Sequence, residues 1–181
     1  MAKVGRLVID PGHGGSRPGV ILKDSDGKVL VREADAALHT ALTLKWVLLN
    51  ELEVPFDVVL TRNEDVWVPF HRRTNTYGDL FVAIHYDIPN GGKPIYYQAR
   101  GGVSKCVAGF VNALSGHEHP LWSTRRAAHV GGRLYIDDVH YPAILVEIDT
   151  IDNYKNDREY RLAKARPLAK ALKEVMDVFL A

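Results

Sequence analysis

Three side chains that can bind a metal or move a proton stand at the ends of apolar segments. His13 stands in VIDPGHGG, directly after a run typical of a buried strand, and His85 closes the apolar run LFVAIH. Glu147 lies near the end of a third such run, AILVEI. Chemistry in open α/β sheets gathers outside the carboxyl ends of the strands, so we expect these residues to lie together. The glycines around His13 allow a sharp turn and leave open space beside the imidazole.

Two imidazoles and one carboxylate are a typical catalytic zinc shell, in which three protein ligands leave the fourth tetrahedral position for water. The chain has no HExxH motif, so the ligands must come from separate elements. Glu33, at the start of the first predicted long helix, supplies a carboxylate. It could instead be only an N-terminal helix carboxylate, and Asp35 is the rival ligand. Zinc lowers the pKa of its water to about 7, and a free carboxylate such as Glu147 can take the proton.

The elements that would position these residues alternate along the chain. We expect strands at residues 5–10, 56–61, 80–85, 93–99 and 143–148. We expect helices at residues 33–52, 69–77, 104–114 and 157–180, with Pro167 kinking or restarting the last one. Residues 20–32 predict a hairpin around Asp26-Gly27, and residues 115–132 predict a loop. This order indicates a single α/β domain spanning residues 1–181, with a mostly parallel twisted sheet and helices on both faces.

The composition excludes several classes of protein. The chain has 181 residues, 46% of them hydrophobic and 25% charged, which is ordinary for a soluble globular domain. Its net charge of +1 gives no strong attraction to nucleic acid or to an anionic membrane. The lone cysteine, Cys106, can form neither an intrachain disulfide nor a CxxC zinc knuckle, and we expect it to be buried in a helix.

The start of the sequence leads directly into the first predicted strand. MAKVGRLVID shows no charged n-region followed by an apolar h-region, so no signal peptide is predicted. No apolar run reaches the roughly 18–20 residues that a membrane span needs. We therefore expect synthesis in the cytoplasm without membrane insertion.

The sequence resembles the zinc-dependent N-acetylmuramoyl-L-alanine amidases, which cut the amide between muramic acid and the first alanine of the peptidoglycan stem peptide. Five segments carry this resemblance in order along nearly the whole chain: VIDPGHGG (8–15), EADAAL (33–38), VVLTRNED (58–65), DLFVAIH (79–85) and PAILVEI (142–148). The resemblance implies that His13, Glu33 and His85 bind one zinc ion. It implies Glu147 as the general base, which later returns a proton to the leaving amine.

The sequence departs from the family pattern after the second histidine and after the glutamate. Asp87 stands where the family usually has Asn. The stretch IDTIDN (148–153) replaces a Gly-Phe and Ser-Asn pattern, of which only Asn153 matches. The segment between Arg72 and Asp79 is also shorter. These departures concern substrate contacts and hydrogen bonds around the metal more than the metal site itself.

Several other histidines could have a role in the site. His117 and His119 in GHEHP could bind metal, but no third ligand accompanies them, so we expect a polar loop over the site. His140 precedes the glutamate strand and could line the cleft or lie outside it. We expect packing or surface positions for the remaining three: His39, His71 and His129.

The resemblance also implies a biological setting. Cellular members of the family usually carry an export signal and wall-binding modules, so a compact catalytic domain without them resembles a phage endolysin. Such an enzyme acts at the cell wall after a holin opens the membrane; the alternative is one domain of a longer exported protein. We see no second long amphipathic segment between Gly101 and Tyr141 that could plug the site, so no activator protein is expected. Two other functions stay open: hydrolysis of another amide, as by a deacetylase, and wall binding without catalysis.

Overall fold

The structure is a computed structural model that describes residues 5–116, 119–128 and 134–181. Its central sheet contains β1 (Arg6–Pro11), β4 (Asp57–Leu60), β5 (Leu80–Asp87), β6 (Ile95–Tyr97), β7 (Leu121–Ser123) and β8 (Ala143–Thr150). The strand order is β4-β1-β5-β8-β6-β7. All neighbouring strands are parallel except β6 and β8, so β6 and β7 run against the other four. The carboxyl ends of β1, β5 and β8 therefore meet at one edge.

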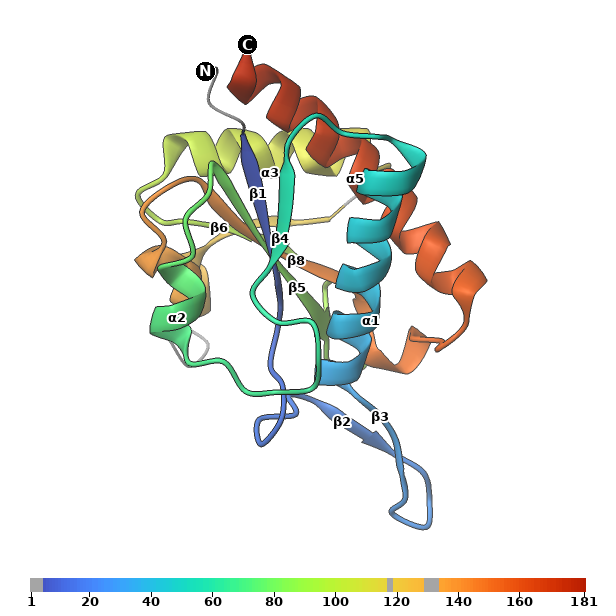
Figure 1. The fold of residues 1–181 in the computed structure, drawn as a ribbon. Coiled ribbons are helices and arrows are strands. Elements are labelled where there is room, and N and C mark those ends of the chain that lie inside the picture. The colour runs from blue at the N-terminus through green and yellow to red at the C-terminus, as the bar shows by residue number, and fades with distance from the viewer. Residues whose placement is uncertain (1–4, 117–118, 129–133) are drawn as a thin grey trace.

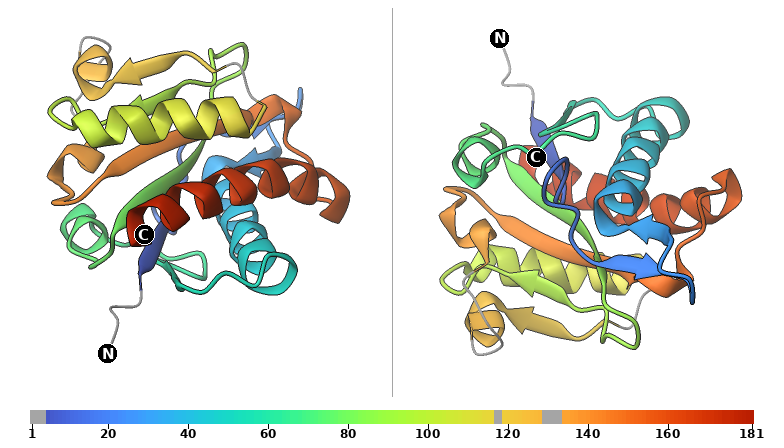
Figure 2. Two further views of the ribbon diagram at one scale, coloured as in Figure 1. Left: turned by 90° about the horizontal axis from the view of Figure 1, so that it is seen from above. Right: turned by 90° about the horizontal axis from the view of Figure 1, so that it is seen from below.

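The three long helices pack on one face of this sheet. They are α1 (Glu33–Trp46), which continues as a π-helical turn η1 (Val47–Glu51), α3 (Gly102–Leu114) and α5 (Arg158–Leu180). Their apolar side chains join those of β1, β5 and β8 in the larger hydrophobic core. In the view from below in Figure 2, α1 and the short helix α2 (Phe70–Thr74) lie on opposite sides of the sheet.

A smaller core covers the opposite face. It contains Val8, Phe81, Ala83, Ala143 and Leu145 from the sheet, together with Ile136 and Val139. Ile136 belongs to a 3₁₀ turn, η2 (Tyr135–Asp138), which lies against α2. Because side chains alternate along a strand, every second residue of β5 and β8 points into this smaller layer. His85 and Glu147 belong to that set of positions.

A two-stranded hairpin, β2 (Ile21–Lys23) and β3 (Val29–Arg32), lies outside the main sheet. Figure 1 shows it projecting from one end of the molecule, whereas the start of β1 and the end of α5 lie at the other end. The hairpin leads directly into α1, so its base lies where α1 begins.

The predicted α/β class with a mostly parallel sheet is confirmed, with four differences in detail. Residues 115–132 were expected to form a loop, but they contain β7 and the short helix α4 (Thr124–Ala128). The turn η2 was not predicted. Helix α5 is continuous through Pro167, so of the two expected outcomes, a kink or a restart, the restart does not occur. Cys106 is exposed rather than buried, and it lines an open apolar groove between α3 and α5. In the described part of the chain, no helix is long and apolar enough to cross a bilayer.

Candidate metal centre

Three predicted ligand residues come together at the carboxyl edge of the sheet. His13 follows β1, His85 lies in β5, and Glu33 is the first residue of α1. His13 Nε2 lies 3.0 Å and His85 Nδ1 lies 2.9 Å from Glu33 Oε1. One donor atom from each residue lies within 4.8 Å of the others, and no other such group is found within the described ranges. Two ring nitrogens and a carboxylate oxygen are a donor set that suits zinc.

The Glu33 carboxylate is fixed by its own neighbours. Its Oε2 accepts a hydrogen bond of 2.9 Å from the Val20 amide, and the Glu33 amide donates to the Val20 carbonyl. Burial alone would raise the pKa of Glu33, but hydrogen bonds from His13 and His85 hold it well below its usual range. Glu33 is therefore ionised and directed at the two imidazoles. The rival, Asp35, instead forms a bidentate ion pair with Arg32.

Because Gly12 and Gly19 have no side chain, they leave the space in which the histidines and Glu33 meet. A Cβ atom at Gly12 would lie 2.5 Å from the His85 ring, and one at Gly19 would lie 2.5 Å from Glu33 Oε2. His13 itself has a φ of 59°, in the left-handed region that non-glycine residues rarely adopt. The glycines around the imidazole therefore let the second histidine and the glutamate approach it.

Two buried arginines hold the loop that carries His13. Arg62 donates to the Gly12 carbonyl at 2.7 Å and to the Ala34 carbonyl at 2.8 Å. Arg73 donates to the carbonyls of Pro11 and His13. Arg62 stands in the motif VVLTRNED, to which no role was assigned, and Arg73 was not predicted. Nothing in the sequence distinguishes Arg73 from the exposed Arg72 beside it.

Glu147 lies beside the three ligand candidates without joining them. The parallel register pairs it with His85, so both side chains point to the same face from adjacent strands. Its Oε2 atom is buried and has no hydrogen-bond partner in the part of the chain that the structure describes. The pKa of Glu147 is raised well above its usual value, mainly by burial and to a smaller extent by the negative charges of Glu33 and Asp87. A carboxylate of this kind has a strong tendency to take up a proton.

The group opens into a cavity of about 540 Å³. One wall is aromatic: the Phe70 and Tyr135 rings stack with centroids 4.9 Å apart, and Trp67 contacts Phe70 edge-on. Arg17 lies over the Trp67 ring, 4.7 Å from its centroid. These aromatic residues were not predicted, because isolated aromatic residues in irregular segments have no periodicity to mark them.

Asp87, the departure from the family pattern, also lines this cavity. Its two carboxylate oxygens accept hydrogen bonds from the amides of Ile88 at 2.8 Å and Lys93 at 3.1 Å. Within the turn that these bonds close, a Cβ atom at Gly91 would lie 2.2 Å from the carboxylate. Asp87 thus shapes the loop after β5 and adds a negative charge near Glu147.

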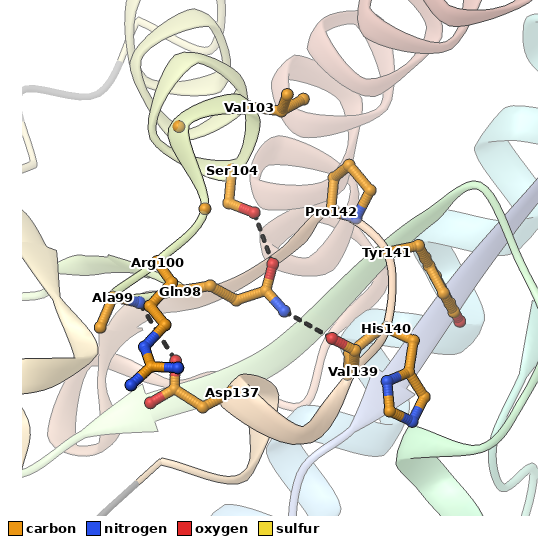
Figure 3. Close-up of a pocket in the computed structure, with 12 residues that line it drawn as sticks. Gln98, Ala99, Arg100, Val103, Ser104, Asp137, Val139, His140, Tyr141 and Pro142 are labelled. Carbon is orange, nitrogen blue, oxygen red and sulfur yellow. Dashed lines mark hydrogen bonds between the residues drawn. The ribbon is translucent and has the colours of Figure 1, made fainter.

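The other histidines that the structure describes lie away from the metal centre. His119 is buried beside Val146 and Ile148, on the sheet face opposite Glu147, so the expected polar loop over the site does not include it. His117 and His129 lie outside the described residues. His39 packs against Tyr154, to which it is hydrogen-bonded, and His71 is exposed. His140 lines a different cavity of about 750 Å³ at the start of β8 (Figure 3).

The fold and the site define an α/β domain with a candidate metal centre at the carboxyl ends of its parallel strands. The family model described as N-acetylmuramoyl-L-alanine amidase matches residues 7–177. The chain therefore belongs to the N-acetylmuramoyl-L-alanine amidase family.

Individual relatives agree with this assignment. The amidase AmiA of Escherichia coli K12 is 30% identical over 176 residues, which are 91% of this chain and 55% of AmiA. The amidase AmiC of Escherichia coli O6:H1 is 34% identical over 107 residues, which are 54% of this chain and 24% of AmiC. The chain thus spans between a quarter and about half of these curated relatives.

Solved structures share the fold. The catalytic domain of the amidase CwlV from Bacillus (Paenibacillus) polymyxa has a TM-score of 0.76 at 22% identity, covering 97% of this chain and 99% of that domain. Cwp6 from Clostridium difficile has a TM-score of 0.73 at 28% identity, covering 98% of this chain and 29% of Cwp6.

Proposed function

We propose that this domain is a zinc-dependent N-acetylmuramoyl-L-alanine amidase that hydrolyses the amide between N-acetylmuramic acid and L-alanine in peptidoglycan. The observation that carries the proposal is the position of Glu147. One oxygen of Glu147 is buried without a hydrogen-bond partner among the described residues, and it lies next to a convergent His-Glu-His group in a member of an amidase family. Burying a polar atom without a hydrogen bond costs free energy, which indicates a functional reason for its position.

In this proposal His13, Glu33 and His85 hold one zinc ion. When bound, zinc supplies Lewis-acid chemistry, polarising the amide carbonyl and lowering the pKa of water. Glu147 takes the proton from the attacking water, and the water oxygen forms a bond to the carbonyl carbon. Glu147 then returns that proton to the alanine nitrogen as the carbon–nitrogen bond breaks. The raised pKa of Glu147 favours the first transfer, because it strengthens the tendency of the carboxylate to take up a proton.

The cavity fits the substrate class in its chemistry. Aromatic rings such as Trp67 and Phe70 offer flat apolar surface, and Arg17 offers a cation for the carboxylates of a stem peptide. The ligands and Glu147 line an open hollow, so we expect the domain to need no activator protein. The absence of a separate wall-binding domain, the endolysin role and the dependence on a holin stay predictions from the sequence.

The decisive experiment combines metal analysis with product analysis. Purified protein should hold about one zinc ion, as one complete ligand set predicts. Mass spectrometry of digested muropeptides should show newly exposed alanine amines. Release of acetate instead would identify a deacetylase, and binding to sacculi without any product would identify a wall-binding module. Full activity of metal-free protein would overturn the zinc proposal.

Paired glutamate variants separate the two carboxylate roles. Glu147→Gln should keep its zinc and lose about 10²–10⁴-fold in rate, the usual contribution of a general base. Glu33→Gln should lose zinc affinity together with rate. Asp35→Asn is the matched control, because that carboxylate lies on the same helix turn but pairs with Arg32, and it should keep both. Loss of zinc from Glu147→Gln, with retention by Glu33→Gln, would reverse the assignment.

A further inference from the structure

The hydroxyl group of Tyr135 connects the buried Asp10 to one of the ligand histidines. Tyr135 Oη donates a hydrogen bond to Asp10 Oδ2 and lies 3.4 Å from His85 Nε2. Asp10 is fully buried and also accepts from Arg73 and Thr61 through its other oxygen. Tyr135 thus contacts the side of the His85 ring that faces away from Glu33.

The direction of these hydrogen bonds determines the tautomer of His85. A carboxylate only accepts hydrogen bonds, so the single phenolic proton of Tyr135 must point to Asp10. The Tyr135 oxygen can then only accept from His85, which places a proton on Nε2. Nδ1, which lies 2.9 Å from Glu33 Oε1, is then the nitrogen that would exchange its hydrogen bond to Glu33 for a metal ion.

We propose that Tyr135 and Asp10 are positioning residues that hold His85 as its Nε2–H tautomer, with Nδ1 presented to the metal. This inference rests on the zinc site of the proposed function. Partners of this kind orient metal-bound histidines in general and raise their basicity, and losing one typically costs about 10–100-fold in metal affinity.

The surroundings of Tyr135 make it a rigid support. Its ring stacks on Phe70 and contacts Phe81 edge-on. The turn η2 that carries it is held from behind by Gln98, whose side-chain amide donates to the Ile136 carbonyl at 3.0 Å and the Val139 carbonyl at 2.8 Å. Figure 3 shows Gln98 between the N-terminus of α3 and this turn.

The same buried carboxylate reaches the other ligand histidine by a second route. Asp10 forms an ion pair with Arg73 at 2.9 Å, and Arg73 donates to the carbonyl of His13. Asp10 therefore supports His85 through the Tyr135 side chain, and it supports His13 through Arg73 and the backbone carbonyl of His13.

Tyr135→Phe tests the inference, because it removes only the hydroxyl group. We expect zinc affinity, measured by competition with a chelator, to fall about 10–100-fold, and the visible spectrum of the cobalt-substituted protein to change. Tyr141→Phe is the matched control: its hydroxyl donates to the Thr76 carbonyl, away from the metal centre, so zinc affinity and spectrum should stay as in the wild type. Wild-type zinc affinity in folded Tyr135→Phe would overturn the inference.

Nitrogen NMR of the zinc-loaded wild-type protein gives a second test that needs no variant. His85 should carry a slowly exchanging proton on Nε2 and bind metal through Nδ1. Coordination through Nε2 would overturn the inference even if Tyr135→Phe failed to fold. A wild-type protein that binds no zinc would instead refute the proposed function, so the two failures can be told apart.

Discussion

Asp87 influences the site both by its hydrogen bonds and by its charge. The carboxylate accepts from two backbone amides of the loop after β5 and therefore holds one wall of the cavity. Its negative charge is also one of the causes that raise the pKa of Glu147. An asparagine, which the family usually has here, would keep one acceptor oxygen and remove the charge.

Asp87→Asn should shift the pH dependence of the reaction. Removing the negative charge of Asp87 lowers the pKa of Glu147, because the ionised Glu147 is then no longer repelled by that second carboxylate. The proposed base must be ionised, so activity rises with pH through its pKa, and this acidic limb should move to lower pH. The measurement is kcat/KM against pH for the variant and the wild type.

Asp24→Asn is the matched control for this comparison. Asp24 also accepts from two backbone amides, at 3.0 and 2.9 Å, but it does so in the exposed hairpin turn. It is not among the groups that raise the pKa of Glu147. Its variant should keep the wild-type pH profile; an unshifted profile in Asp87→Asn would contradict the predicted influence of that charge.

Individual residues differ in how far their place in the site can be predicted. His13, Glu33, His85 and Glu147 were found because they stand at strand ends or at a helix start, in recognisable motifs. Tyr135 escaped prediction, because its contact with His85 joins residues 50 positions apart that no local pattern connects. Their functional roles remain predictions that the variants above test.

The secondary-structure elements show the same distinction. The strands β1, β5 and β8 are buried on both faces, so each appears in the sequence as a continuous apolar run. In contrast, β7 has three residues and, among the described residues, pairs only with β6. A run this short cannot show period-two alternation, so the sequence predicted a loop. The turn η2 was missed for the same reason.

Pro167 lies inside α5, which continues on both sides of it. Proline has no amide hydrogen, so the carbonyl of residue 163 loses its helical hydrogen bond, and the ring crowds that turn. Pro167→Ala should therefore raise the free energy of unfolding by about 1–3 kcal/mol. The restored hydrogen bond stabilises the folded helix, whereas the loss of the proline ring makes the unfolded chain less restricted and offsets part of this gain. Urea unfolding followed by circular dichroism measures this change.

Pro69→Ala, at the N-cap of α2, is the control and should bring no such gain, because no helical hydrogen bond is restored there. An unchanged or lower stability in Pro167→Ala would show that α5 accommodates the proline without cost.

In the whole molecule, the site lies in the thinner of two layers around the sheet. The long helices and the larger core stabilise one face, whereas short turns cover the other and leave room for the cavity. Two acidic residues near the end of β8 have different surroundings, because the β5–β8 register shifts after Glu147. Glu147 points into the cavity, and Asp149, two residues further along, forms an ion pair with Lys164 of α5. We infer that Asp149 stabilises the docking of the C-terminal helix, while Glu147 serves the site.

The Asp149 ion pair predicts how stability depends on pH. Burial alone would raise the pKa of Asp149, but hydrogen bonds from Lys164, Asn153 and the Thr150 amide outweigh it and lower the pKa. A lowered pKa in the folded state means stabilisation that is present above the ordinary aspartate pKa of about 3.9 and is lost as pH falls through the lower folded value. Asp149→Asn should reduce the free energy of unfolding at pH 7 by about 1–3 kcal/mol.

The difference between Asp149→Asn and the wild type should then shrink below about pH 4, where protonation removes the charge from the wild-type residue as well. Urea unfolding of both proteins at pH 7 and at pH 3 measures this convergence. Asp177→Asn is the control, because its ion pair with Lys173 lies on the surface of α5 and contributes little at either pH. A difference that stays constant between the two pH values would mean that Asp149 stabilises α5 through its shape and neutral hydrogen bonds. In that case the charge of Asp149 would contribute nothing to holding the helix on the sheet.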